Sequence, residues 1–292
     1  MKLVSVFSPE RPWVWLAPLV AVLAVFTLFP FFYNIYLSFH EFNSFRRTLV
    51  FVGFDNWKGM FEDAKMWRAF SVTLIYMTVC LSVQFVLGLG LALLINADGR
   101  GYHLIRSLLL LPLVVPPAVV GMMFLLMEDS QFGVLSWMLQ SLNLIAAGAP
   151  LLTSSKTALV GVMLADIWQW TPFMVLIMLA GLHALPKEPF EAALVDGARF
   201  RHMLFHLMLP MLRPIIAVAL LIRGIDLFRV FDYVFVMTSG GPGIATQTLS
   251  FYTWKQSFSF VKWGYAATLS LFSLVFLIVV AHAFIRAAKV RW

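Results

Sequence analysis

Residues 191–197 read EAALVDG, and residues 207–210 read LMLP. Both stretches belong to a polar segment, residues 183–212, that separates two long apolar runs. The proline and acidic residues around position 188 suit the first turn of a short helix, and Gly197 can adopt the left-handed conformation that ends it. Helical spacing continues after this glycine in Phe200, Met203, Leu204 and Leu207. The sequence therefore predicts two short helices joined at Gly197, on which a soluble partner can dock; an interfacial connector without a partner is the alternative.

The composition is that of a membrane protein. Of the 292 residues, 61% are hydrophobic and only 12% are charged, and the mean hydropathy is +0.89. The formal charge of +7 comes from basic residues scattered along the flanks of apolar runs, without a nucleic-acid-binding motif, so no nucleic-acid partner is expected. The single cysteine, Cys80, excludes a disulfide framework and a thiolate metal cluster and is interpreted as a packing residue.

Six apolar runs each reach the length of about 20 residues that spans a hydrocarbon core. They are Trp13–Phe39, Ala69–Ile95, Leu104–Met127, Ala158–Leu182, Ile215–Thr238 and Trp263–Ile285. The first run is longer than the core of a signal peptide, about 7–15 apolar residues, and is expected to remain as an uncleaved helix. The sequence thus predicts an all-α membrane protein with six transmembrane helices, and residues 1–292 form a single transmembrane domain.

The distribution of lysine and arginine favours cytoplasmic N and C termini. On that side would lie Lys2, Arg11, Arg100, Arg106, Lys187, Arg199, Arg201, Arg213, Arg286, Lys289 and Arg291. The later external loops would hold Lys156, Lys255 and Lys262, whereas the first external loop is an exception, with Arg46, Arg47, Lys58, Lys65 and Arg68. This orientation places residues 183–212 in the cytoplasm.

The pattern in residues 191–210 resembles the EAA loop of binding-protein-dependent ABC importer permeases. In that family the loop is a coupling helix that docks into a groove of the ATP-hydrolysing subunit. The resemblance assigns this role to Glu191, Ala192, Ala193, Asp196, Gly197, Leu209 and Pro210. Leu207 departs from the pattern, because isoleucine is usual there.

A second stretch resembles one branch of this family. Residues 228–242, FRVFDYVFVMTSGGP, are similar to the signature of the MalF/UgpA-like branch of carbohydrate permeases. This branch implies a type I ABC importer permease fold in a bacterial inner membrane. It also implies four kinds of partner: a MalG-like second permease subunit, a dimer of ABC ATPase subunits, an extracytoplasmic substrate-binding protein and a sugar or polyol substrate.

No Gly-x-x-x-x-Gly-Lys-Ser/Thr sequence occurs, so the chain is not expected to bind ATP through a P-loop. It is expected to be a non-catalytic subunit without a cofactor, with ATP and Mg²⁺ bound by the partner ATPase subunits. His202 and His206 are four residues apart but are interpreted as part of a solvated face rather than as metal ligands.

The third apolar run contains Pro112, Pro116 and Pro117, which remove helical hydrogen bonds. The sequence predicts a bent or broken helix here. A broken helix can present backbone groups to a translocation path, although proline kinks also occur without a substrate.

Polar residues in the fourth run share one helical face, formed by Asp166, Gln169, Trp170 and Phe173. A carboxylate, an amide and two aromatic rings suit a sugar, whose hydroxyls and C–H faces they would contact. Belt aromatics at the outer interface are the alternative. The resemblance to MalF-type permeases places this face on the substrate path, with Arg223, Asp226 and Val230 opposite.

The fifth run carries Arg223, Asp226, Arg229 and Asp232 at spacings of three. Such charges within a span mark a functional site, but the spacing also permits structural ion pairs along one helix. A stand-alone secondary transporter or channel that uses these charges is the alternative function. Secondary carriers usually contain two related halves, and no repeat is evident in this sequence.

Overall fold

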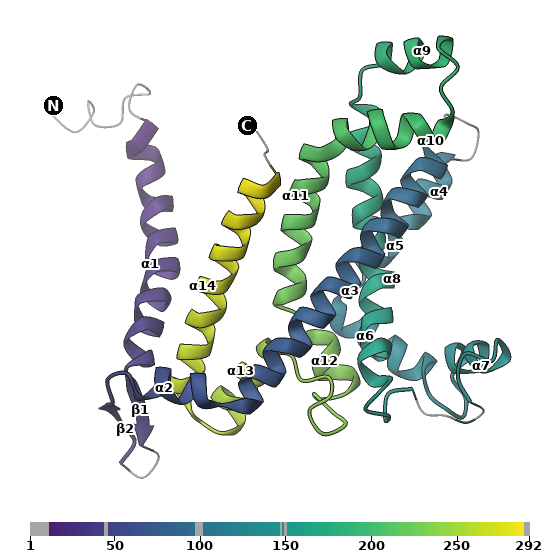
Figure 1. Ribbon diagram of the computed structural model, residues 1–292. Coiled ribbons are helices and arrows are strands. Elements are labelled where there is room, and N and C mark those ends of the chain that lie inside the picture. Colours follow the sequence, from purple (N-terminus) through teal and green to yellow (C-terminus); the bar gives the residue numbers. More distant parts are fainter. Residues whose placement is uncertain (1–11, 44–45, 97–101, 147, 149–150, 289–292) are drawn as a thin grey trace, which may run out of the picture. The chain divides into compact units, whose positions relative to one another are not determined.

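The computed structural model describes residues 12–43, 46–96, 102–146, 148 and 151–288 (Figure 1). The chain divides into two compact units, one made of Met1–Asp63 and Thr253–Val275 and the other of Ala64–Tyr252 and Phe276–Trp292. The last helix, α14 (Trp263–Ala288), contributes to both.

The first unit begins with the long helix α1 (Pro12–Ser38), whose side chains from Trp15 onward are largely exposed, as expected of a helix that faces lipid. An antiparallel hairpin of β1 (His40–Asn43) and β2 (Thr48–Phe51) follows, and then the short helix α2 (Asp55–Glu62). A π-helical turn, η2 (Lys255–Ser259), leads into α14.

Close backbone packing joins the parts of this first unit. The Asn56 side-chain amide donates to the carbonyl oxygens of Ser38 (2.9 Å) and His40 (3.0 Å). A Cβ added at Gly264 would collide with the His40 carbonyl, so only glycine fits at this start of α14. The Tyr265 hydroxyl donates to Asp63 at 2.6 Å.

The second unit starts with α3 (Ala64–Ile95), which is followed by α4 (Tyr102–Leu109), α5 (Leu111–Val114), α6 (Pro117–Met127) and α7 (Val134–Ser141). The long helix α8 (Ala158–His183) comes next. Residues 104–114 and 117–127 form a bent pair with an angle of 96° between the two halves. The predicted break at the prolines of the third run is therefore confirmed.

The segment after α8 turns back on itself before it re-enters the apolar region. It contains α9 (Glu188–Val195), α10 (Phe200–Met203), the π-helical turn η1 (Leu204–Met208) and α11 (Leu209–Phe228). The helices α12 (Asp232–Met237) and α13 (Leu249–Trp254) follow. In Figure 1, α9 and α10 lie beyond the ends of the long helices α8 and α11.

The core of the second unit lies where α3, α8 and α11 pack together. It includes Ala92, Met174, Met178, Leu182 and Leu212, all buried. Small residues permit this approach: a Cβ at Gly88 would clash with Met174, and a Cβ at Gly181 would press against Leu212. Small residues at helix crossings are typical of packing within membranes.

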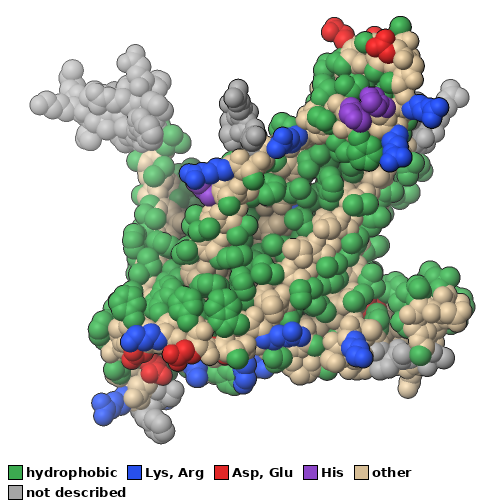
Figure 2. All heavy atoms as spheres, viewed as in Figure 1, with side chains coloured by type: hydrophobic (Ala, Val, Ile, Leu, Met, Phe, Trp, Pro, Cys, Tyr) green, Lys and Arg blue, Asp and Glu red, His purple; other side chains and the backbone are tan. Residues whose placement is uncertain are grey.

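Among the described residues, five helices are long and apolar enough to cross a membrane, and there are six spans if the bent pair counts as one. Hydrophobic side chains cover most of the visible length of these helices, and charged side chains gather toward their ends (Figure 2). The prediction of a mostly helical membrane protein is confirmed, with five to six candidate spans and one addition. The β1–β2 hairpin was missed, because four-residue strands in a polar loop give too short an alternation to detect. Of the basic residues used for orientation, Lys2, Arg11, Arg100, Lys289 and Arg291 lie outside the described residues.

Candidate functional site

The predicted coupling segment forms a helix, a tight turn and a second helix. Pro189 occupies the first turn of α9, and Glu188 and Glu191 place negative charge at its N-terminus, where the helix dipole favours it. Gly197 has a φ of +74°, and its N–H donates to the Leu194 carbonyl at 3.1 Å, so the glycine ends the helix in the left-handed conformation that was predicted.

Apolar side chains of α9 are exposed. Val195 is 88% exposed and Leu194 is 60% exposed, although both belong to a helix that lies beyond the spans. Glu191, Ala192 and Asp196 are exposed as well. An exposed helix with apolar side chains at its tip has the character of a docking surface for another protein.

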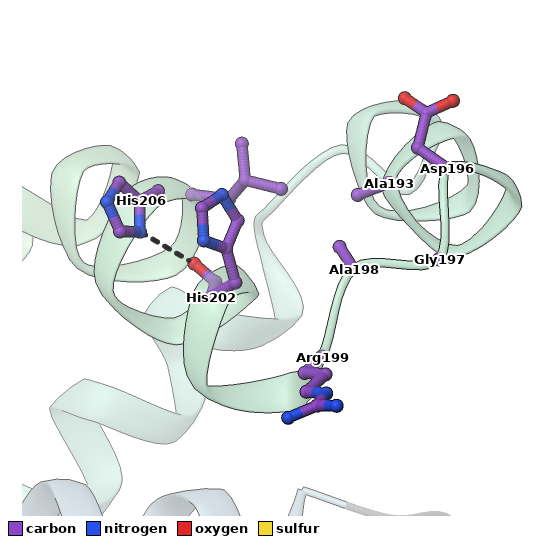
Figure 3. Close-up of a pocket in the computed structure, with 8 residues that line it drawn as sticks. Ala193, Asp196, Gly197, Ala198, Arg199, His202 and His206 are labelled. Carbon is purple, nitrogen blue, oxygen red and sulfur yellow. Dashed lines mark hydrogen bonds between the residues drawn. The ribbon is translucent and has the colours of Figure 1, made fainter.

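A groove of about 530 Å³ lies between α9 and α10. Ala193 and Ala198 lie on one side of it, and the imidazole rings of His202 on α10 and His206 on η1 lie side by side on the other (Figure 3). The two rings stack with centroids 4.1 Å apart, and His206 Nδ1 is 3.2 Å from the His202 carbonyl oxygen. Both histidines are exposed, in agreement with their interpretation as a solvated face.

A second group of predicted site residues meets in the interior of the spans. Asp166 on α8 is 2% exposed and forms an ion pair with Arg223 on α11. The Tyr76 hydroxyl on α3 donates to the other carboxylate oxygen at 3.0 Å, and the Gln84 amide donates to Oδ1 at 2.7 Å. The Arg223 Nε donates in turn to Gln84 Oε1 at 2.9 Å. This Asp166–Arg223 network joins three helices through groups that satisfy one another, as buried charges require.

Trp170 connects this network to the broken span. Its ring lies 4.6 Å from the guanidinium carbon of Arg223, and its indole N–H donates to the Tyr233 hydroxyl at 3.1 Å. Tyr233 donates to Gln169, whose amide donates to the Val115 carbonyl at 2.6 Å. Val115 lies at the break between α5 and α6, so Gln169 satisfies a carbonyl close to the prolines that interrupt the helix.

The remaining predicted path residues have different surroundings. Phe173 is half-buried and contacts Trp170 edge to face with centroids 6.1 Å apart. Val230 is buried, and its carbonyl accepts a hydrogen bond from Thr248 at 3.1 Å. Asp226 is exposed.

The alternative of ion pairs along the fifth helix is wrong for Arg223. Its ion pair runs to Asp166 on α8, not along its own helix. The helix α11 also ends at Phe228, so Arg229 and Asp232 lie at and beyond a break, and both are exposed. The regular spacing could not show this break, because the apolar pattern continues through it.

Three members of the network were not predicted from the sequence: Tyr76, Gln84 and Tyr233. A signal was present for Gln84, because an amide inside an apolar span needs a buried partner. Tyr76 and Tyr233 are common residue types in such spans, and nothing in their spacing connects them with Asp166.

A buried carboxylate, Glu128, lies just after α6 and was also missed. Its side chain is 2% exposed, and neither carboxylate oxygen has a hydrogen-bond partner among the residues that the structure describes. A Cβ added at Gly161 of α8 would collide with Glu128 Oε2. Burial raises the pKa of Glu128 to about 8.

This raised pKa predicts that the protein loses stability as the pH rises. The folded state holds a proton on Glu128 that the unfolded chain releases at its ordinary, lower pKa, so stability falls between about pH 4.5 and 8 and levels off above. Glu128→Gln should reduce the loss of thermal stability between pH 6 and pH 9, measured on the purified protein in detergent. The exposed-carboxylate control Glu62→Gln should leave it unchanged. An equal pH dependence in Glu128→Gln and wild type would contradict the assignment.

The apolar spans identify an integral membrane protein. A broken span, a charge network buried between the spans and an exposed helix beyond them are typical of a membrane-embedded subunit of a transport system. Residues 84–289 match the family of binding-protein-dependent transport system inner membrane components. The chain belongs to this family.

Individual relatives agree. The chain is 31% identical, over 94% of its length and 92% of the relative, to the trehalose/maltose transport system permease protein MalF of Thermococcus litoralis. It is also 31% identical, over 94% of its length and 89% of the relative, to the sulfoquinovosyl glycerol transport system permease protein SmoG of Agrobacterium fabrum.

The fold has a solved counterpart. The crystal structure of a bacterial ABC transporter involved in the import of the acidic polysaccharide alginate matches with a TM-score of 0.80, 23% identity and 96% coverage of both chains. This match supports the fold. The family and the relatives identify the chain as a multi-pass ABC importer permease, a non-catalytic membrane subunit, and a stand-alone carrier or channel is not favoured.

Proposed function

We propose that the chain is one of two permease subunits of an ATP-driven importer of a sugar or polyol and forms half of the translocation path. The relatives named for trehalose, maltose and sulfoquinovosyl glycerol support the substrate class. The observation that carries the coupling role is the exposed apolar tip of α9, ended by the left-handed Gly197.

The complex proposed around this chain has a MalG-like second permease, a dimer of ABC ATPase subunits that bind ATP and Mg²⁺, and an extracytoplasmic substrate-binding protein. It resides in a bacterial inner membrane with both termini of this chain in the cytoplasm. The basic residues Arg199 and Arg201 beside α9 are consistent with a cytoplasmic location for this end.

In this proposal α9 docks on the ATPase through Glu191, Ala192, Ala193 and Asp196, and Gly197 sets the angle between α9 and α10. Leu209 and Pro210 begin α11, which follows η1 without an interruption of the helical chain. Movement of the docked helix is therefore passed to α11, which carries Arg223 of the Asp166–Arg223 network.

In this proposal the predicted path residues have two roles, support of the site and contact with the sugar. Asp166, Gln169 and Arg223 are buried and occupied by protein partners, so we assign them to holding Trp170 in place. Val230 is likewise buried against Thr248. Trp170, Phe173 and Asp226 retain exposed surface and are the proposed contacts of the sugar.

Trp170→Ala should lower uptake of the native sugar up to about tenfold, because a stacking ring contributes on the order of 1 kcal/mol beyond its buried area. Assembly and basal ATPase activity should remain. The control is Trp168→Ala, which removes a neighbouring tryptophan that packs on Phe124 instead. Normal uptake by Trp170→Ala would place the sugar site elsewhere.

The function is tested by copurification and by ligand binding. A tagged form of this chain should copurify with an ATPase subunit and a second permease. The cognate binding protein should show a thermal shift with one member of a panel of sugars and polyols. A panel without any shift, together with a shift for an amino acid or a metal ion, would contradict the substrate class.

A further inference from the structure

A narrow apolar groove of about 150 Å³ lies between α3, α11 and the second half of α14, all within the second unit. Its described lining consists of apolar side chains and Gly224, among them Leu81, Leu221, Phe276 and Phe284. Because this lining offers no hydrogen-bonding side chain, a sugar or a peptide would have to bury polar groups there without partners.

Aromatic rings pack together around Phe276, which lines one end of the groove. Phe276 stacks on Phe228 with centroids 5.2 Å apart, and Phe70 meets Phe276 edge to face at 4.9 Å. These rings lie toward the end of α11, so we take the opposite end, past Phe284 and toward the beginning of α11, as the opening of the groove.

Arg213 provides a positive charge near the opening of the groove. Arg213 lies about two turns before Leu220 on α11, on the same helical face. It is exposed, and among the described residues its one hydrogen bond is from Nη2 to the Ala287 carbonyl near the end of α14, at 3.4 Å. Most of the guanidinium donors therefore remain available to an anion beside the opening.

We propose that the groove binds an acyl chain of an anionic phospholipid whose headgroup phosphate pairs with Arg213. The apolar lining fits a hydrocarbon chain, and the charge at the opening fits the phosphate. A helix of a partner protein is about 10–12 Å in diameter with its side chains and would lie over a narrow groove instead of entering it. With the orientation proposed above, the opening faces the cytoplasmic leaflet.

Native mass spectrometry of the intact importer in detergent tests the proposal, with phosphatidylglycerol and phosphatidylcholine of identical chains as probes. Phosphatidylglycerol should bind more tightly to the wild type. Arg213→Gln should weaken its binding about fivefold and remove the preference over phosphatidylcholine. The matched control Arg286→Gln removes an exposed arginine near the same end, on a different face of α14 from Phe284, and should change binding less than about twofold.

Filling the groove provides a second test. An added Cβ at Gly224 meets only Leu81, at an ordinary 3.8 Å, so the backbone accepts a side chain there. Gly224→Leu should abolish photolabelling of α11 and α14 by a phosphatidylglycerol with a photoreactive group in its acyl chain, whereas Gly224→Ala should retain it. Equal binding of the two lipids, an equal effect of Arg286→Gln, unchanged labelling of Gly224→Leu, or crosslinking of Leu221→Cys to another subunit would each overturn the proposal.

Discussion

Arg223→Met is expected to destabilise the protein by about 3–5 kcal/mol, because it leaves the Asp166 carboxylate buried without its counter-charge. Asp166 is 2% exposed, and its remaining partners, Tyr76 and Gln84, are neutral. The loss should appear as a lower abundance in the membrane and a lower midpoint of thermal unfolding in detergent.

The double variant Asp166→Asn/Arg223→Met provides the decisive comparison. It removes both charges, so its destabilisation should be clearly smaller than the sum of the two single effects. Asp226→Asn on the same helix is the matched control, because Asp226 is exposed and should change stability by less than about 0.5 kcal/mol. Additive single effects would show that the pair does not interact as described.

Gly197→Val is expected to reduce ATP-driven uptake at least about tenfold without loss of the protein from the membrane. Gly197 has a φ of +74°, which a β-branched residue adopts only at a cost of about 1–3 kcal/mol. No atom lies within 4 Å of an added Cβ, so the effect comes from the backbone and not from a clash. The strained turn changes the angle at which α9 meets the ATPase, and that angle controls coupling.

Gly197→Asn is the matched control, because asparagine tolerates the left-handed conformation and should retain most of the uptake. Glu191→Lys should also impair uptake, because it reverses the charge in the first turn of α9. ATPase activity and uptake are measured together for each variant. Uptake by Gly197→Val at the wild-type rate would contradict the coupling role.

The elements predicted well from sequence are those governed by local rules. Apolar length located the spans, the prolines at 112, 116 and 117 located the broken helix, and Gly197 located the turn after α9. Each of these signals acts within a few residues, so a single chain without relatives is sufficient to detect it.

The partners of the buried charges could not be predicted in the same way. Asp166 and Arg223 were recognised as costly within a span, but their pairing depends on how α8 packs against α11. The spacing of Arg223, Asp226, Arg229 and Asp232 favoured pairs along one helix only while that helix was assumed to be continuous. The burial of Glu128 was not predicted, because a carboxylate at the end of an apolar run normally reaches water.

Reconstitution into proteoliposomes tests the central claim, that this chain transports only as part of an ATP-driven complex. The chain is combined with its second permease, the ATPase subunits and the loaded binding protein, and uptake of the labelled sugar is measured with and without ATP. We expect uptake that requires ATP and every subunit and that is lost in Gly197→Val. Uptake of the sugar by this chain alone, driven by an ion gradient without ATP, would contradict it.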